Sequence, residues 1–217
     1  MVKRGWSPPA YKVDENGKIV DRAPPSGPHN WGRWGALDEK GTANFLTPEM
    51  VVAAAGLIRT GQVFSLALPL EKGGPVHPER SDIVHLYAYS GADFIVGSAL
   101  NDRFPNFQGS DDYIFMPLQG STQWDALAHC AFDDAIYNGF WAGTVEGYGG
   151  ATRGSIHRMR DSFVGRGVLL DIARHKGVDR LEPGYAVTAD DLDACAESEG
   201  VEIRTGDIVI VRTGHVP

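Results

Sequence analysis

Eleven residues carry more information than any others in this chain: Gln119-Gly120-Ser121-Thr122-Gln123-Trp124-Asp125-Ala126-Leu127-Ala128-His129. They concentrate amide, hydroxyl, carboxylate and imidazole groups. They also follow an apolar run, Tyr113-Ile114-Phe115-Met116-Pro117-Leu118, that is typical of a β-strand. We therefore expect the side chains at positions 119, 123, 125 and 129 to converge on one ion or one substrate.

The local pattern predicts a helix inside this segment. Thr122-Gln123-Trp124-Asp125 resembles a capping box, so we expect Thr122 to cap a helix rather than to react. On such a helix Asp125 and His129 share one face. An imidazole pKa near 6.5 suits a group that transfers protons, although an Asp and His pair can also do no more than stabilise a helix.

Composition narrows the functional classes. The chain has 217 residues, 42% of them hydrophobic, which is enough for one substantial core. Its formal charge of −8 leaves no basic stripe, so we expect neither nucleic-acid binding nor attachment to an anionic membrane. The amino terminus lacks the apolar stretch of a secretory signal, and a cytoplasmic location is predicted.

Other nucleophiles and nucleotide motifs have little support. Cys130 and Cys195 lack the spacing of a zinc site, and we expect Cys130 to be a small buried apolar residue. Ser121 lacks the Gly-x-Ser-x-Gly context of a serine nucleophile. The glycines between positions 147 and 154 do not form a dinucleotide-binding motif, and they predict a loop.

Two regions are expected along the chain. Residues 1–30 are rich in proline and predict an extended arm, and residues 31–217 predict one domain. The arm region and its border carry Trp6, Trp31 and Trp34, which are costly to expose, so we expect the arm to dock on its own core or on a second subunit.

Strand and helix patterns alternate through the domain. The patterns predict helices over 47–59 and 188–199, the second with a capping box and a terminal Gly200, and strands over 62–70 and 83–89. The apolar runs 167–173 and 206–212 predict strands buried on both faces. The mixture indicates an α/β or α+β domain.

The polar segment resembles the signature His-x-Gly-Thr-His-x-Asp-x-Pro-x-His of the putative cyclase family, which includes bacterial kynurenine formamidases and isatin hydrolases. Thr122, Asp125 and His129 match it, whereas Gln119 and Gln123 stand where the family usually has two metal-binding histidines. The segments Trp34 to Glu49, Gly165 to Asp171 and Gly206 to Gly214 also resemble family segments, in the same order.

This resemblance implies a swivelling β/β/α fold and a hydrolase that cleaves an amide, lactam or lactone of a small aromatic or polyketide-like molecule. His129 would be the general acid or base and Asp125 a metal ligand or a partner of His129. Family members continue beyond the point that corresponds to Pro217, so we expect this chain to be truncated or part of a longer polypeptide. A homodimer or homotetramer is also expected.

The ligand set leaves alternatives open. Gln119, Gln123 and Asp125 would bind a divalent metal (Mn, Zn or Mg), although amide oxygens suit Mg²⁺, Ca²⁺ or Mn²⁺ better than Zn²⁺. Equally, both glutamines would only make hydrogen bonds around a pocket, where Trp124 also contacts the substrate. A metal-independent cyclase or isomerase and a non-catalytic small-molecule-binding protein are the two rival functions.

Overall fold

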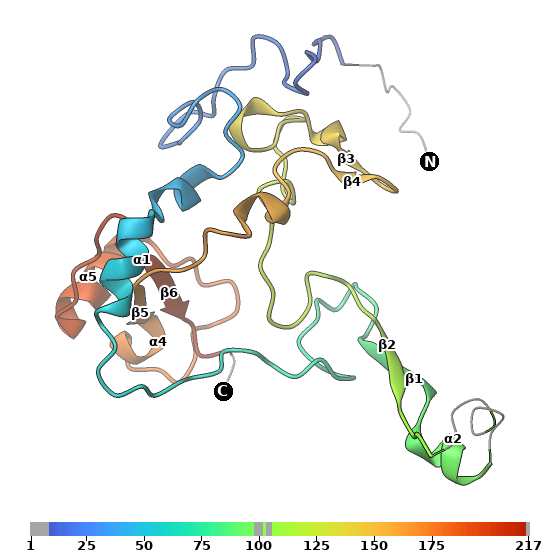
Figure 1. The fold of residues 1–217 in the computed structure, drawn as a ribbon. Coiled ribbons are helices and arrows are strands. Elements are labelled where there is room, and N and C mark those ends of the chain that lie inside the picture. Colours follow the sequence, from blue (N-terminus) through green and yellow to red (C-terminus); the bar gives the residue numbers. More distant parts are fainter. Residues whose placement is uncertain (1–8, 98–101, 103–105, 216–217) are drawn as a thin grey trace. The chain divides into compact units, whose positions relative to one another are not determined.

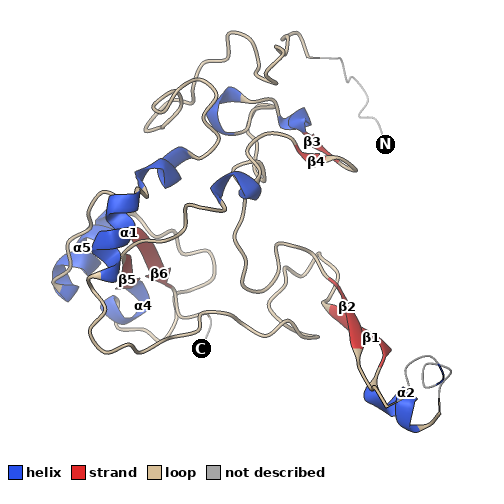
Figure 2. Cartoon of the chain, in the orientation of Figure 1, coloured by secondary structure: helices blue, strands red, loops and turns tan. Residues whose placement is uncertain are grey.

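The computed structural model describes residues 9–97, 102 and 106–215, so the predicted docking of Trp6 lies outside the described residues. The chain divides into two compact units: unit 1 comprises residues 1–61 and 126–217, and unit 2 comprises residues 62–125. The described residues contain both helices and strands, and the strands form three small sheets (Figure 2). This mixture confirms the predicted α/β class. The swivelling arrangement stays a prediction. Within the described ranges, no helix has the length and apolarity needed to cross a membrane.

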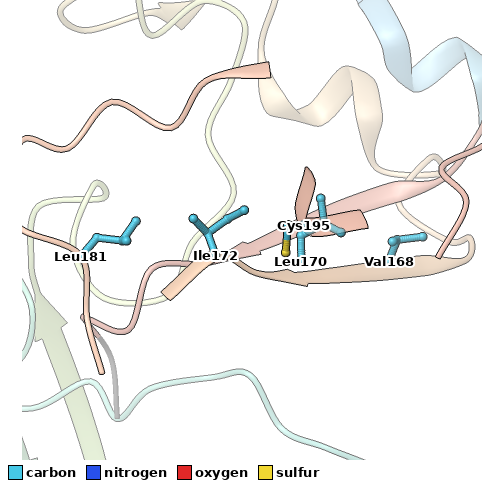
Figure 3. Close-up of a cluster of buried hydrophobic side chains, with 5 residues drawn as sticks. All are labelled: Val168, Leu170, Ile172, Leu181 and Cys195. Carbon is cyan, nitrogen blue, oxygen red and sulfur yellow. The ribbon is translucent and has the colours of Figure 1, made fainter. Parts of the chain in front are cut away.

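The main core of unit 1 lies around one parallel strand pair. Strand β5 (Gly167–Asp171) pairs with β6 (Ile208–Arg212), and helix α5 (Ala189–Glu199) packs on β5. Figure 3 shows the buried side chains of this core. They are Val168, Leu170, Ile172, Leu181 and Cys195.

Helix α5 (Ala189–Glu199) begins and ends as its sequence predicts. The Thr188 hydroxyl accepts a hydrogen bond from the backbone N–H of Asp191, whose carboxylate accepts one from Thr188 in return. Gly200 ends the helix at φ 65°, a conformation that glycine adopts without steric cost. The capping box is confirmed.

The prediction that β5 and β6 are buried on both faces is wrong. Alternate residues of β5 are buried, but Leu169 between them is 54% exposed, and most of β6 is exposed. A continuous apolar run shows that both faces of a strand could be buried, but burial of both faces requires a layer on each side of the sheet. Helix α5 covers only one face.

Helix α1 (Pro48–Ala55) begins where predicted, with Pro48 at its first position and Glu49 in its first turn. Its last residue is Ala55, four residues before the predicted end at position 59, and Gly56 is the cap residue. The segment ahead of it forms the short helix η1 (Gly41–Phe45). Both belong to unit 1.

Part of the proline-rich segment packs on other residues of unit 1. Residues 13 and 19 form an antiparallel bridge across a tight turn, and Lys18 bridges Phe140. Ile19 is buried, and its N–H donates to the Gly139 carbonyl at 3.0 Å. The boundary predicted at residue 30 stays a prediction.

A second, smaller core of unit 1 follows residue 126. It contains Ala128, Ile136 and Phe140. The remaining elements of unit 1 are η2 (Tyr137–Gly139), η3 (Ala142–Thr144), β3 (Val145–Glu146), β4 (Gly150–Ala151), η4 (Ile156–Met159) and α4 (Ile172–His175).

Unit 2 contains one antiparallel pair, β1 (Val84–Tyr89) with β2 (Asp111–Phe115), and the short helix α2 (Gly91–Ile95) (Figure 1). The strand predicted over 83–89 is confirmed. The strand predicted over 62–70 is wrong, because these residues form no regular strand. The Leu68 N–H instead donates to the Thr122 hydroxyl.

Candidate functional site

The first half of the polar segment is held by loop residues of unit 2 and forms no helix. Gly120 bridges Val76, and the N–H of Ser121, at φ 56°, donates to the Pro75 carbonyl at 2.7 Å. The Thr122 hydroxyl accepts from Leu68 N–H at 2.9 Å. The predicted helix cap at Thr122 is therefore wrong, since the hydroxyl binds another segment rather than the N–H groups that follow it.

The predicted site residues fall in both units. Gln119, Gln123, Trp124 and Asp125 belong to unit 2, where the Trp124 side chain is 62% exposed, and His129 belongs to unit 1. Residues 121–129 form no helix, so the helical spacing that was expected to place Asp125 and His129 on one face does not apply.

The predicted metal ligands offer a poor set of donors. Among the residues that the structure describes, no group of three or more His, Cys, Asp or Glu side chains could hold a metal ion. The Arg80 guanidinium donates to the backbone carbonyl of Gln119 at 2.7 Å. One carboxylate and two neutral amide oxygens fit Zn²⁺ poorly and suit Mg²⁺, Ca²⁺ or Mn²⁺ better.

His129 lies in a tight turn that is anchored to a glycine. The His129 N–H donates to the Ala126 carbonyl at 3.0 Å, and the Ala128 N–H donates to the Gly154 carbonyl at 3.1 Å. Ala128 is only 8% exposed and packs in the small core with Ile136. The backbone on the amino-terminal side of His129 is therefore fixed by hydrogen bonding and by packing.

A cavity of about 660 Å³ opens beside this turn, entirely within unit 1. Leu127 and Cys130, on either side of His129 in sequence, contribute to its wall. Cys130 is exposed, so the expectation that it is buried is wrong. The remaining lining residues are Asp21, Arg22, Ala23, Pro24, Pro25, Ser26, Trp31, Phe132, Asp133, Ala135, Ile136 and Tyr137.

The proline-rich segment forms one wall of the cavity. The Arg22 guanidinium donates to the carbonyls of Phe132 and Asp133, which joins residues 21–26 to the opposite wall. Asp21 and Asp133 have positive φ values of 57° and 47°, which are uncommon for residues other than glycine. Such conformations cluster at functional sites, where surrounding contacts maintain them.

Behind the cavity, Asn138 links two segments of unit 1. Its side chain is 2% exposed, and its Oδ1 accepts from the Gly32 N–H at 2.8 Å. Its Nδ2 lies 3.0 to 3.1 Å from the carbonyl oxygens of Gly35, Ala36 and Asp38. Asn138 thereby fixes the segment that carries Trp31 to the cavity wall.

Asp38 is the centre of a second group of hydrogen bonds. Its carboxylate accepts from the N–H groups of Lys40 and Gly41, the Asn44 amide and the Tyr137 hydroxyl, at 2.7 to 3.2 Å. Burial alone raises the pKa of Asp38, but these four donors outweigh it and hold the pKa below its usual range. Burial and the Asp38 carboxylate raise the pKa of the Tyr137 phenol, which stays protonated.

Glu39 joins the same segment to the loop behind Ala128. Its carboxylate, 9% exposed, accepts from Arg153 Nη1 at 3.0 Å, Gly154 N at 2.7 Å and Arg158 Nε at 3.2 Å. Sequence reasoning assigned no role to Asp38, Glu39 or Asn138. The available signal for Asp38 and Glu39 was the resemblance of the segment Trp34 to Glu49, which contains both, to a family segment.

The comparisons with known proteins support the resemblance to the putative cyclase family. A family model described as "Putative cyclase" matches residues 64–216. No curated protein matches the chain. A solved structure described as "Crystal structure of a novel cyclase" is similar, with 45% sequence identity and a TM-score of 0.80 over 86% of this chain. The match covers 62% of that protein, so this chain spans less than two thirds of its length.

Proposed function

The chain belongs to the "Putative cyclase" family, and from that premise we propose that it is a hydrolase that opens an amide, lactam or lactone bond of a small aromatic or polyketide-like molecule. The observation that carries the proposal is the position of the cavity, whose wall includes Leu127 and Cys130 close to His129 in sequence, while His129 itself is not one of the lining residues. A volume of about 660 Å³ lies within the range of small-molecule sites.

The chemistry of the cavity wall supports a flat, partly apolar substrate. Trp31, Phe132 and Tyr137 supply aromatic surface, and Asp133 and Arg22 supply charge at one side. Residues 21–26 are rich in proline, and proline loses little conformational entropy when a ligand is bound against it.

His129 is the proposed general acid and base. It takes a proton from water as the water oxygen attacks the substrate carbonyl, and it returns that proton to the leaving nitrogen or oxygen as the carbon–heteroatom bond breaks. Asp125 is proposed to support His129. Gln119, Gln123 and Trp124 are proposed to hold the substrate.

No step is assigned to a metal ion. The poor fit of two amides and one carboxylate to Zn²⁺ favours a second candidate, a metal-independent cyclase or isomerase in which His129 transfers a proton without net addition of water. A divalent ion bound by Gln119, Gln123 and Asp125 stays a prediction. A non-catalytic binding protein would use the same cavity and show no turnover.

The test is a panel of aryl formamides, lactams and lactones, incubated with protein purified without chelator and assayed with and without added EDTA. We expect turnover of at least one class. Metal analysis of the same sample separates the mechanisms, since loss of activity with EDTA would favour the metal-assisted version. Binding of panel compounds without any turnover would reject the hydrolase.

Two matched variants connect turnover to the cavity. Cys130→Trp fills the space from an exposed position and is expected to reduce kcat/KM at least about tenfold, because it displaces the substrate. Glu182→Trp places the same side chain at an exposed position outside the cavity and is expected to have no effect. Equal activity of the two variants would show that the cavity is not the site.

A further inference from the structure

Glu39 is a buried carboxylate with a defined set of partners. It makes hydrogen bonds to two guanidinium groups and one backbone N–H, and all three donors come from residues 153–158. A buried charge is tolerated only when such partners replace the water it has lost. The carboxylate therefore determines where this loop lies.

The loop in turn determines the position of Ala128. Gly154 donates its N–H to Glu39 and accepts the Ala128 N–H at its carbonyl, at 2.7 Å and 3.1 Å. The close approach requires glycine: φ is 62°, and a Cβ atom at Gly154 would lie 3.3 Å from the Ala128 nitrogen. Movement of residue 154 is thus transmitted directly to the residue before His129.

One further contact restrains the same loop. The Arg153 guanidinium lies 5.2 Å from the centre of the Phe140 ring, which is fully buried in the core that includes Ala128. Arg153 thereby joins the Glu39 ion pair to that core through a cation–π contact. The Glu39 carboxylate, the loop at residues 153–158 and the small core are therefore connected to one another and to the turn before His129.

We propose that Glu39 is a positioning residue for His129, acting through Gly154 and Ala128 without contact with the substrate. This rests on the proposed function of His129. A catalytic group misplaced by about 1 Å loses roughly a hundredfold in rate, so a carboxylate that fixes its backbone affects turnover as well as stability.

A double-mutant cycle separates positioning from general stabilisation. Glu39→Gln keeps the size of the side chain and removes its charge, and we expect it to reduce kcat about tenfold to a hundredfold with little change in KM. In the His129→Ala background the same substitution is expected to change the residual rate less than about twofold. An equal loss in both backgrounds would overturn the proposal.

Glu199→Gln is the matched control. Glu199 also accepts from a guanidinium, Arg174 Nη2 at 2.8 Å, but it lies on α5 and makes no described hydrogen bond to the loop at residues 153–158. We expect its kcat to equal that of the wild type. A loss as large as that of Glu39→Gln would show that removal of any such ion pair is sufficient.

A measurement without substrate keeps the inference testable if the proposed hydrolase activity fails. The imidazole NMR signal of His129, assigned by its loss in His129→Ala, is expected to shift in Glu39→Gln, whereas the signals of His77 and His85 in unit 2 do not. If Glu39→Gln fails to fold, Gly154→Ala disturbs the same carbonyl and leaves the ion pairs in place. An unchanged His129 signal in the folded variant would overturn the proposal.

Discussion

Asn138 combines a buried side chain with a left-handed backbone. Its φ is 60°, and its amide joins residues 32–38 to the turn at 137–139. Asn138→Gly keeps the backbone conformation available and removes the amide, so we expect a loss of about 3 kcal/mol in the free energy of unfolding, measured in urea.

Asn106 provides the control for that substitution. It has a similar φ of 67° but is exposed, so Asn106→Gly is expected to change the free energy of unfolding by less than about 0.5 kcal/mol. If the two variants lost equal stability, the backbone rather than the amide would be the cause.

The lowered pKa of Asp38 makes the free energy of unfolding depend on pH in a defined direction. Its pKa is lower in the folded protein than the usual value near 4, so its contribution is fully present above pH 4 and is lost as pH falls through the lowered pKa. We expect Asp38→Asn to lose about 2 kcal/mol at pH 7 and progressively less below pH 4.

Urea titrations of both proteins at pH 7 and pH 3 measure this difference. Asp161→Asn serves as the control, because Asp161 is exposed and pairs only with the neighbouring Arg160 among the described contacts. A gap between wild type and Asp38→Asn that stays constant with pH would contradict the assignment.

Individual site residues were only partly predictable from the sequence. The motif predicts His129 and Asp125 as site residues. Glu39 was missed because its partners are 114 to 119 residues away in sequence, and no local pattern shows such pairing. The burial expected for Cys130 was wrong for the same reason, since exposure depends on which segments surround it.

At the scale of single elements, the two threonine caps differ in a way that can be measured. The Thr188 hydroxyl accepts from Asp191 N–H, whereas the Thr47 hydroxyl makes no capping hydrogen bond at the start of α1. We expect Thr188→Ala to lose about 1 kcal/mol in thermal or urea unfolding and Thr47→Ala to lose less than about 0.5 kcal/mol. The reverse order would contradict the observed caps.

The same comparison explains which elements could be predicted. Helix α5 was predicted at both ends because its cap, its body and Gly200 lie within one short segment. A similar pattern at Thr122 predicted a helix that is absent, because residues 66–68 bind the hydroxyl instead. Local signals determine an element only where no distant segment competes for the same groups.

On the scale of the whole molecule, the two units differ in how their strands are covered. Val168 and Leu170 of β5 are buried, whereas nearly every residue of β1 and β2 is exposed. We expect hydrogen exchange to be at least about 100-fold slower in β5 than in β1 and β2. Exchange in β1 and β2 as slow as in β5 would show that the hairpin is covered in solution.

The class of fold was predictable from the alternation of strands and helices, but the division into units was not. The sequence predicts one continuous site in the polar segment. The boundary between the units follows residue 125, so Asp125 belongs to unit 2 and His129 to unit 1. Oligomeric state and location in the cytoplasm stay predictions.

The most direct test of the central claim is the turnover number of His129→Ala on a substrate that the wild type converts, compared with His157→Ala. His157 is an exposed histidine of η4 that contacts Arg160 and lies outside the polar segment 119–129. We expect a fall in kcat of about 10² to 10⁴ for His129→Ala and no change for His157→Ala. Full turnover by folded His129→Ala would contradict this expectation.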